Sequence, residues 1–268
     1  MSKVRHWPCG KWKRFYMNII IPSYKRSDNL KGKDYFHMAK YCVPKSQKQD
    51  YINEVGENRV IAIPDECDGD IIKKRNWILK NIERPLIMID DDVESIGYYE
   101  NRNGENDGEH KKKTLPKDYL MEFFMQSFEM CNQFGAKMWG ISQNEDNRIY
   151  KEFLPFSLSQ ICLGPLQGHL NHDLIFDEKV GSKDDYDMAL QQLNKYKKVF
   201  RWNKFHYICE HGDNKGGIVS YRSKDKEIEY CKRIMLKWGK KIISYQLPPK
   251  KMADLLNAKK VNIPIKGV

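Results

Sequence analysis

The residues best suited to chemistry form a run of acids directly after an apolar stretch. Residues 86–89, Leu-Ile-Met-Ile, are followed by Asp90, Asp91 and Asp92. Adjacent carboxylates repel one another, and they are stable at the mouth of a buried strand when a cation or abundant solvent lies there. Side chains alternate along an extended chain, so we expect Asp90 and Asp92 to share one side and Asp91 to point away.

This pattern predicts a site for a divalent metal that holds a nucleotide diphosphate. Asp92 is the first candidate ligand, and Asp90 is expected to contact either ribose or metal. Carboxylate oxygens suit Mg²⁺ or Mn²⁺, which take their other ligands from water and phosphates. The alternative interpretation is a solvated turn at the end of a strand.

A second acidic cluster lies nearly a hundred residues later, at Asp184, Asp185 and Asp187. Ser182 and Asp185 fit a helix-capping pattern, so helix initiation alone explains one of these acids. It does not explain three. A carboxylate at this position that stays ionised near neutral pH could accept a proton from an attacking hydroxyl group.

The elements that must position these acids alternate between strand and helix. Apolar runs at 17–22 and 59–63 each meet a proline and are typical of buried strands. Residues 28–39 and 70–82 are predicted helices, and the second ends before Pro85. This alternation predicts an α/β fold with a central, mostly parallel sheet flanked by helices. Ligands bind such a sheet beyond the carboxyl ends of its strands, which is where Asp90 to Asp92 fall.

The remainder of the chain is predicted to continue in the same way, as one domain over residues 1–268. Its core covers about 17–217, and a basic, helical C-terminal extension covers about 218–268. We expect further helices at about 117–134, from 182 through 193, and at about 224–239, and further strands at 136–142 and 159–168. Residues 98–118 are predicted to form a long loop, and the tail from 248 onward is predicted to pack loosely.

Composition limits the possible partners. The formal net charge of +11 favours a polyanion, although lysines on a solvated surface would give the same value. Basic and aromatic residues interleave over 3–15, and Lys111 to Lys113 add a basic flap, so both segments are candidates for contacting nucleic acid. Seven scattered cysteines without a Cys-x-x-Cys pair argue against zinc and for reduced thiols. No apolar run is long enough for a membrane span or a secretion signal, so we expect a cytoplasmic protein.

Taken together, the elements resemble those of a nucleotide-sugar glycosyltransferase of the GT-A fold. The similarity covers roughly residues 17–217. It rests on the opening strand and loop at 19–26, on Arg75-Asn76, on the Asp-x-Asp element and on the acidic helix at 184–187. More narrowly, the chain resembles the TET-associated glycosyltransferases of tailed phages, through Gly164 to His169, the Asp-Asp-Tyr-Asp helix and the stretch 214–217.

This resemblance implies roles for individual residues. Asp90 and Asp92 would hold ribose and metal, and Asp185 would act as the base if the reaction inverts the sugar. Asp184 stands where the commoner motif carries glutamate, which leaves open which member of the pair faces the acceptor. A late histidine would complete the metal site, with His211 as the better candidate and His206 as the second. The nucleotide would be contacted by Pro22, Ser23, Tyr24, Arg26, Arg75, Asp90 and Asp91.

The implied function is metal-dependent transfer of a sugar, from a UDP-sugar or a related donor, to hydroxymethylated pyrimidine in DNA. The reaction would take place in the cytoplasm of an infected bacterium and would need no protein partner. Three alternatives remain. The same fold could act on a glycan, lipid or protein; clustered aspartates could belong to a metal-dependent nuclease or nucleotidyltransferase; or the acids could be structural in a non-catalytic DNA-binding protein.

Overall fold

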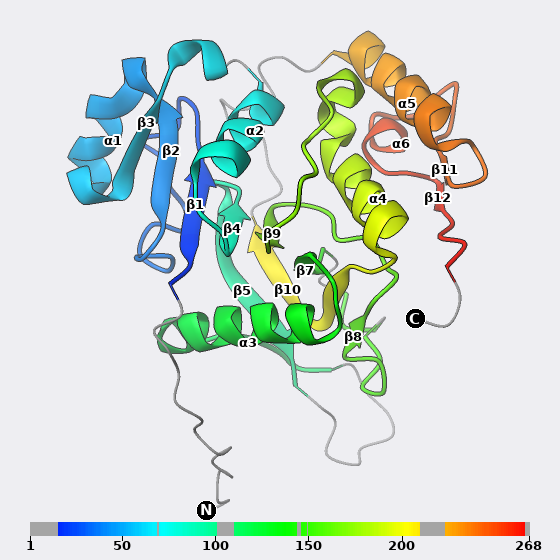
Figure 1. Cartoon of the computed structure of the whole chain (residues 1–268), viewed down its shortest axis with the longest axis horizontal. Helices are drawn as coiled ribbons and strands as arrows, with labels where there is room; N and C mark the ends of the chain where they lie inside the picture. The colour runs from blue at the N-terminus through cyan, green and yellow to red at the C-terminus, as the bar shows by residue number, and fades with distance from the viewer. Residues whose placement is uncertain are drawn as a thin grey trace, which may run out of the picture.

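The computed structural model describes residues 16–68, 70–100, 110–143, 146–148, 150–209 and 223–265. Its architecture is α/β, with one large mixed sheet flanked by helices, as predicted (Figure 1). The strand order is β3-β2-β1-β4-β9-β7-β10-β5-β6, and β8 pairs with β10 beside this path. The strands of this sheet are β1 (Asn18–Pro22), β2 (Lys40–Pro44), β3 (Val60–Ile63), β4 (Leu86–Ile89), β5 (Val93–Tyr99), β6 (Lys112–Thr114), β7 (Met138–Ser142), β8 (Phe156–Ser157), β9 (Leu166–His169) and β10 (Phe200–Cys209).

The first half of the sheet is parallel and the second half is mixed. Strands β3, β2, β1 and β4 all run in the same direction, so their carboxyl ends meet at one edge. Strand β9 is antiparallel to both β4 and β7, whereas β10 is parallel to β7 and antiparallel to β5. The loops after β1, β2, β3 and β4 therefore gather at one edge of the sheet.

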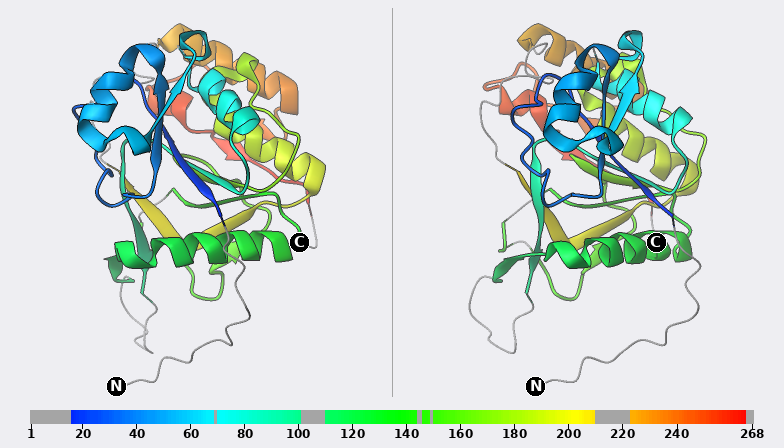
Figure 2. Two further views of the ribbon diagram at one scale, coloured as in Figure 1. Left: turned by 60° about the vertical axis from the view of Figure 1, so that its left-hand side comes forward. Right: turned by 90° about the vertical axis from the view of Figure 1, so that its left-hand side faces the viewer.

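Helices cover both faces of the sheet. They are α1 (Lys48–Val55), α2 (Ile71–Asn81), α3 (Leu120–Gln133), α4 (Asp184–Tyr196), α5 (Lys224–Trp238) and α6 (Ala253–Leu256). Alternation along β1 feeds two separate cores: Ile19 and Ile21 pack with α3 and α1 residues, while Ile20 packs with α2 and α4 residues. Figure 2 shows α3 lying away from α2 and α4 in both further views.

The last described segment packs closely, which corrects the prediction of a loose tail. Strand β11 (Ile243–Ser244) pairs with β12 (Lys260–Val261), and these two strands lie beside α5 and α6 at the upper right of Figure 1. Leu255 is fully buried in a cluster that also contains Tyr186 and Leu190 of α4. Apolar residues scattered through a basic tail were therefore enough to anchor it to α4.

The region between β1 and β2 was also predicted wrongly. Residues 28–39 form turns rather than a helix, and β2 was missed altogether. A Cβ on Gly32 would lie 2.3 Å from the carbonyl oxygen of Val93, so this segment runs directly against the start of β5. The close contact of Gly32 with β5 accompanies a turn conformation where the sequence predicted a helix. Similarly, the predicted loop at 98–118 contains β6, and the predicted strand at 159–168 is reduced to β9.

The other predicted helices and strands are confirmed with shifts of a few residues. No helix in the described ranges has both the length and the apolar character to cross a bilayer. The six cysteines that fall in those ranges are free thiols.

Candidate active site

The three consecutive aspartates form a tight turn that reverses the chain from β4 into β5. The amide of Asp90 donates to the Pro165 carbonyl at 2.7 Å, and the amide of Val93 donates back to the Asp90 carbonyl at 3.2 Å. Because β4 lies beside β1, this turn sits next to the loop that follows β1. Backbone hydrogen bonds therefore fix the acids at the sheet edge where the parallel strands end.

The three carboxylates diverge. Asp91 Oδ2 accepts from Ser23 Oγ at 2.5 Å, and its other oxygen is bound by Arg26. Asp90 instead accepts from Arg75 at 2.8 Å, and Asp92 lies 3.9 Å from the Arg26 guanidinium. Asp91 therefore anchors the loop after β1, and it shares the Arg26 guanidinium with Asp92.

Asp90 and Asp92 keep the more open carboxylates of the turn. Their side chains are 33% and 32% exposed, against 9% for Asp91. Burial, followed by the charges of Asp90 and Asp91, raises the pKa of Asp92 to about 6, and the charge of Arg26 only partly opposes this rise. Negative charge therefore exceeds positive charge around Asp92, which is the electrostatic condition that favours a divalent cation.

Cys209 lies beside this excess charge at the end of β10. Burial raises the pKa of the Cys209 thiol to about 12, and Asp92 adds to the rise as both a neighbouring charge and a hydrogen-bond partner. The thiol is therefore protonated at neutral pH, and it offers Asp92 a weak donor rather than another anion.

Arg75 joins the two acidic clusters. It projects from α2, and its Nη2 donates to Asp90 Oδ1 at 2.8 Å while its Nη1 donates to Asp184 Oδ2 at 2.5 Å. The guanidinium lies over the ring of Phe176 and is buried. Burial alone would lower the pKa of Arg75, but Asp90 and Asp184 together raise it above its usual value. One buried cation therefore brings residues 90 and 184 into a single site.

Asp184 and Asp185 have different surroundings. Asp184 is 4% exposed and is committed to Arg75, and burial raises its pKa to about 6 although Arg75 lowers it. Asp185 is only partly buried. It accepts from the amides of Tyr186 at 2.7 Å and Gly164 at 3.2 Å, and burial raises its pKa while these amides oppose the rise. Asp185 is therefore the member of the pair with its carboxylate held by backbone rather than by a cation.

The capping interpretation of Ser182 does not hold. The residue that precedes α4 is Lys183, which makes no side-chain cap, and Ser182 Oγ donates to Glu227 on α5 at 2.7 Å. Asp187, the third acid of the cluster, is fully buried and accepts from Trp238 Nε1 at 2.7 Å and from Lys237. Residue 187 therefore ties α4 to α5 and takes no direct part in the site.

Two further residues lie at the site: Gly164, which entered the sequence analysis only as the start of the stretch 164–169, and Tyr207, which gave no signal there. Gly164 adopts φ +81°, and a Cβ there would lie 3.2 Å from the hydroxyl of Tyr207. Burial raises the pKa of Tyr207, and Cys209 and the site carboxylates add to the rise. Tyr207 is therefore a neutral phenol that can donate a hydrogen bond among carboxylates that only accept.

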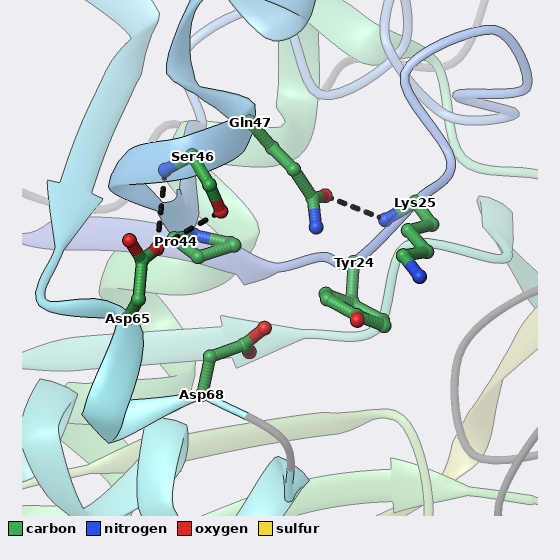
Figure 3. Close-up of a pocket in the computed structure, with 7 residues that line it drawn as sticks. All are labelled: Tyr24, Lys25, Pro44, Ser46, Gln47, Asp65 and Asp68. Atoms are coloured by element: carbon green, nitrogen blue, oxygen red, sulfur yellow. Dashed lines mark hydrogen bonds between the residues drawn. The ribbon is translucent and has the colours of Figure 1, made fainter.

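A cavity of about 450 Å³ opens beyond the ends of β1, β2 and β3 (Figure 3). The residues around it are Tyr24, Lys25, Pro44, Ser46, Gln47, Asp65 and Asp68. Lys25 has the left-handed conformation, with φ 53°, and its amide donates to Gln47 at 2.8 Å. Such a backbone costs about 1–2 kcal/mol in a residue other than glycine, so the Gln47 contact helps to hold the wall in place.

Of the predicted nucleotide-pocket residues, only Tyr24 borders this cavity. Ser23 is buried, and its Oγ lies 2.6 Å from the hydroxyl of Tyr51 and also donates to Asp91. Arg26 pairs with Asp91 too, so Ser23 and Arg26 hold the loop after β1 in place and do not line the cavity. Pro22 ends β1 and is buried. The polar residues after β2 were missed because β2 was missed. Those after β3 were missed although that strand was predicted and the rule that ligands gather beyond parallel strands applies to them.

The histidine predictions have separate outcomes. His211 lies outside the described residues. His206 is buried on β10 and packs against the ring of Tyr99, with centroids 4.9 Å apart, and against Gly97. Along the part of the chain that is described, no group of three or more His, Cys, Asp or Glu side chains could hold a metal ion by itself. A cation at Asp90 and Asp92 would therefore take its other ligands from phosphate and water.

Comparison with known proteins gives one match. A family model described as TET-Associated Glycosyltransferase matches residues 17–217. This span contains both acidic clusters, Arg75 and the residues around the cavity, and it ends before α5. No curated protein and no solved structure matches the chain.

Proposed function

Because the chain belongs to the TET-associated glycosyltransferase family, and is therefore a glycosyltransferase, we propose that it transfers a sugar from a nucleoside diphosphate sugar to 5-hydroxymethylcytosine in DNA. The observation that carries the proposal is the Arg75 bridge between Asp90 and Asp184. It brings an acidic turn suited to a metal and a diphosphate next to Asp185, a carboxylate suited to act as a base. A transferase of this kind needs both functions within one site.

We propose that the donor nucleotide lies in the cavity beside Tyr24, with its diphosphate toward Asp90 and Asp92. The cavity and the acidic turn occupy the same edge of the sheet, since both follow the ends of parallel strands. Mg²⁺ or Mn²⁺ at the two carboxylates would offset the charge that develops on the leaving diphosphate. The excess negative charge around Asp92 supports this assignment.

The acceptor step follows from the surroundings of Asp185. Its carboxylate takes the proton of the hydroxymethyl group as that oxygen attacks the anomeric carbon, and the bond between this carbon and the phosphate oxygen breaks. The nucleoside diphosphate leaves with the bonding electron pair. Two backbone amides hold Asp185 in place without a direct ion pair. Burial raises its pKa, and the amides and the nearby charges of Arg75 and Lys183 only partly oppose this rise, so the pKa stays raised, which favours a base.

The test uses duplex DNA that contains either 5-hydroxymethylcytosine or unmodified cytosine. Each DNA is incubated with UDP-sugars and other common donors in the presence of Mn²⁺, and its nucleosides are then measured by mass spectrometry. We expect one hexose to be added to the hydroxymethylated nucleoside alone. The absence of added hexose with every donor would refute the proposed acceptor.

Other results would point to the alternatives. Donor hydrolysis that DNA leaves unchanged would favour a glycan, lipid or protein acceptor, and cleavage of plain DNA or incorporation of nucleotide would favour nuclease or nucleotidyltransferase chemistry. Asp173→Asn serves as a control for replacing an aspartate of the site, because Asp173 is an exposed carboxylate paired with Lys195. It should behave as the wild type in each assay.

A further inference from the structure

The net positive charge of the chain lies toward its two ends, because residues 1–15 carry five basic and no acidic residues and a larger share follows residue 222. Residues 223–265 carry 11 basic and 4 acidic residues, whereas residues 16–222 carry 30 basic and 32 acidic residues. The part that contains the acidic clusters is therefore close to neutral, and most of the net charge of +11 lies elsewhere. We call residues 223–265 the C-terminal module. It lies outside the span that matches the family model.

Six of the ten lysines of the C-terminal module come in adjacent pairs. These pairs are Lys240-Lys241, Lys250-Lys251 and Lys259-Lys260, and all six residues are exposed. In the described part of the chain, Lys240, Lys241 and Lys260 form no ion pair, whereas Glu227, one of the four acids, is buried against Lys183. The positive charge of the pairs is therefore available to an outside partner.

The antiparallel β11–β12 pair and the turn before it contain three of these lysines. Lys260 lies opposite Ser244, and Ile243 lies opposite Val261. Since Ile243 and Val261 face the core, alternation places Lys260 on the outer face. Lys240 and Lys241 form the turn that leads into β11, and the amide of Asn262 donates to the Ile242 carbonyl at 2.8 Å. The turn therefore lies next to the strand that carries Lys260.

This basic β11–β12 pair contacts the helix that carries the proposed base. The amide of Ala258, which precedes Lys259 and Lys260, donates to Tyr186 Oη at 3.2 Å. Tyr186 is the residue after Asp185, and its ring also meets that of Tyr245, with centroids 6.2 Å apart. Figure 1 shows α5, α6, β11 and β12 alongside α4. A polyanion bound to the β11–β12 pair would thus lie beside the helix that presents Asp185.

We propose that Lys240, Lys241 and Lys260 form a docking surface for the phosphate backbone of DNA. This inference rests on the proposed function, because it supplies the contact that carries the acceptor strand to Asp185. DNA offers closely spaced negative charges along its axis. These charges complement the lysines of the β11–β12 pair and of the turn before it. An anionic membrane fits less well, because Leu236 and Met252 are the module's only large apolar residues that are exposed in the described structure.

The test measures binding of the full-length protein to unmodified duplex DNA as a function of salt concentration. Each phosphate contact that is lost should lower the salt slope by about 0.9 and weaken binding about 5-fold at 150 mM salt. The K240Q/K241Q/K260Q variant should therefore bind about 100-fold more weakly, with a slope smaller by about 3. Its KM for hydroxymethylated DNA should rise while kcat and DNA-independent donor hydrolysis stay unchanged.

Two variants serve as controls. K40Q/K80Q/K117Q removes three exposed lysines, which lie at the start of β2, in the last turn of α2 and just before α3, and it should bind DNA as the wild type does. K240R/K241R/K260R keeps the charge, so it should also retain binding. A fall in affinity that both glutamine variants share, or vesicles containing phosphatidylserine that compete with DNA for the module, would overturn the proposal.

The outcomes also separate this inference from the proposed function. If the wild type neither binds nor glycosylates DNA, the proposed acceptor is wrong and the docking surface is wrong with it. If the wild type modifies DNA and K240Q/K241Q/K260Q does so with an unchanged KM, only the docking surface is wrong.

Discussion

Replacing Arg75 by methionine should destabilise the protein in a way that depends on pH. The substitution leaves Asp184, which is 4% exposed, without its cation. Breaking one side of a buried pair costs about 3–5 kcal/mol. Asp90 adds little, because solvent reaches a third of its side chain. At about 2–4 °C per kcal/mol for a chain of this size, Tm should fall by about 6–20 °C.

The pH dependence follows from the carboxyl group of Asp184. Its pKa is about 6 in the folded wild type, against an ordinary value of 3.8. A folded-state pKa above the unfolded value means that this carboxyl favours folding less as pH rises through that interval. Loss of Arg75 raises the folded pKa further, so the deficit of Arg75→Met should be small near pH 5 and largest near pH 8.

Urea unfolding of the wild type and Arg75→Met at pH 5 and pH 8 measures this deficit. The double variant R75M/D184N removes the buried charge and should recover most of the loss at pH 8. Arg59→Met is the matched control, because Arg59 is a part-buried arginine whose guanidinium donates to the carbonyls of Ala39 and Phe36. Its deficit should be equal at both pH values. A deficit of Arg75→Met that does not change with pH would refute the bridge as the neutralising contact.

Three further predictions concern single residues. Asp185→Asn should lower kcat for transfer about 10²–10⁴-fold, the usual contribution of a general base, while leaving donor binding in a thermal-shift assay intact; weaker donor binding with normal kcat would contradict its role as the base. Asp92→Ala should abolish transfer and Mn²⁺-dependent donor stabilisation but preserve DNA binding, and survival of both activities would show that the metal assignment is wrong. Glu227→Gln should cost about 3–5 kcal/mol in urea unfolding, because it leaves Lys183 buried without a counter-charge, whereas K183M/E227L should be far less harmful; equal losses in the two variants would contradict the pairing.

The sequence predicted those parts of the fold that depend on local patterns. The strand at 86–89 and the helices at 71–81 and 224–238 were recognisable because apolar spacing and capping agree with their final environment. The segment 28–39 was predicted wrongly because its conformation is set by contact with β5, about sixty residues later, through Gly32. Strand β2 was missed because the predicted helix over 28–39 occupied the residues directly before it, although β2 is as long as β1, which was predicted.

The candidate site shows the same division. Carboxylates at 90, 92 and 185 could be found as acidic runs beside predicted strand and helix ends. The Arg75 bridge could not, because each of its contacts depends on how α2 packs between β4 and α4. Tyr207 is equally invisible, since a single tyrosine has no distinctive spacing, and the stretch from Gly164 to His169 did not reveal that the amide of Gly164 holds Asp185. Sequence therefore identified the acids, and tertiary packing decides which of them are open to ligand.

Packing at the start of α4 also explains why one carboxylate is set apart from its neighbours. Lys183 is paired with Glu227 and Asp184 with Arg75, and Asp187 accepts a hydrogen bond from Trp238 of α5. Each of these partners is a side chain from another element, so these charges hold the helix in place. Asp185 alone is held by backbone amides and stays partly exposed. The same change from aspartate to asparagine should therefore reduce stability at 187 and reduce reaction rate at 185.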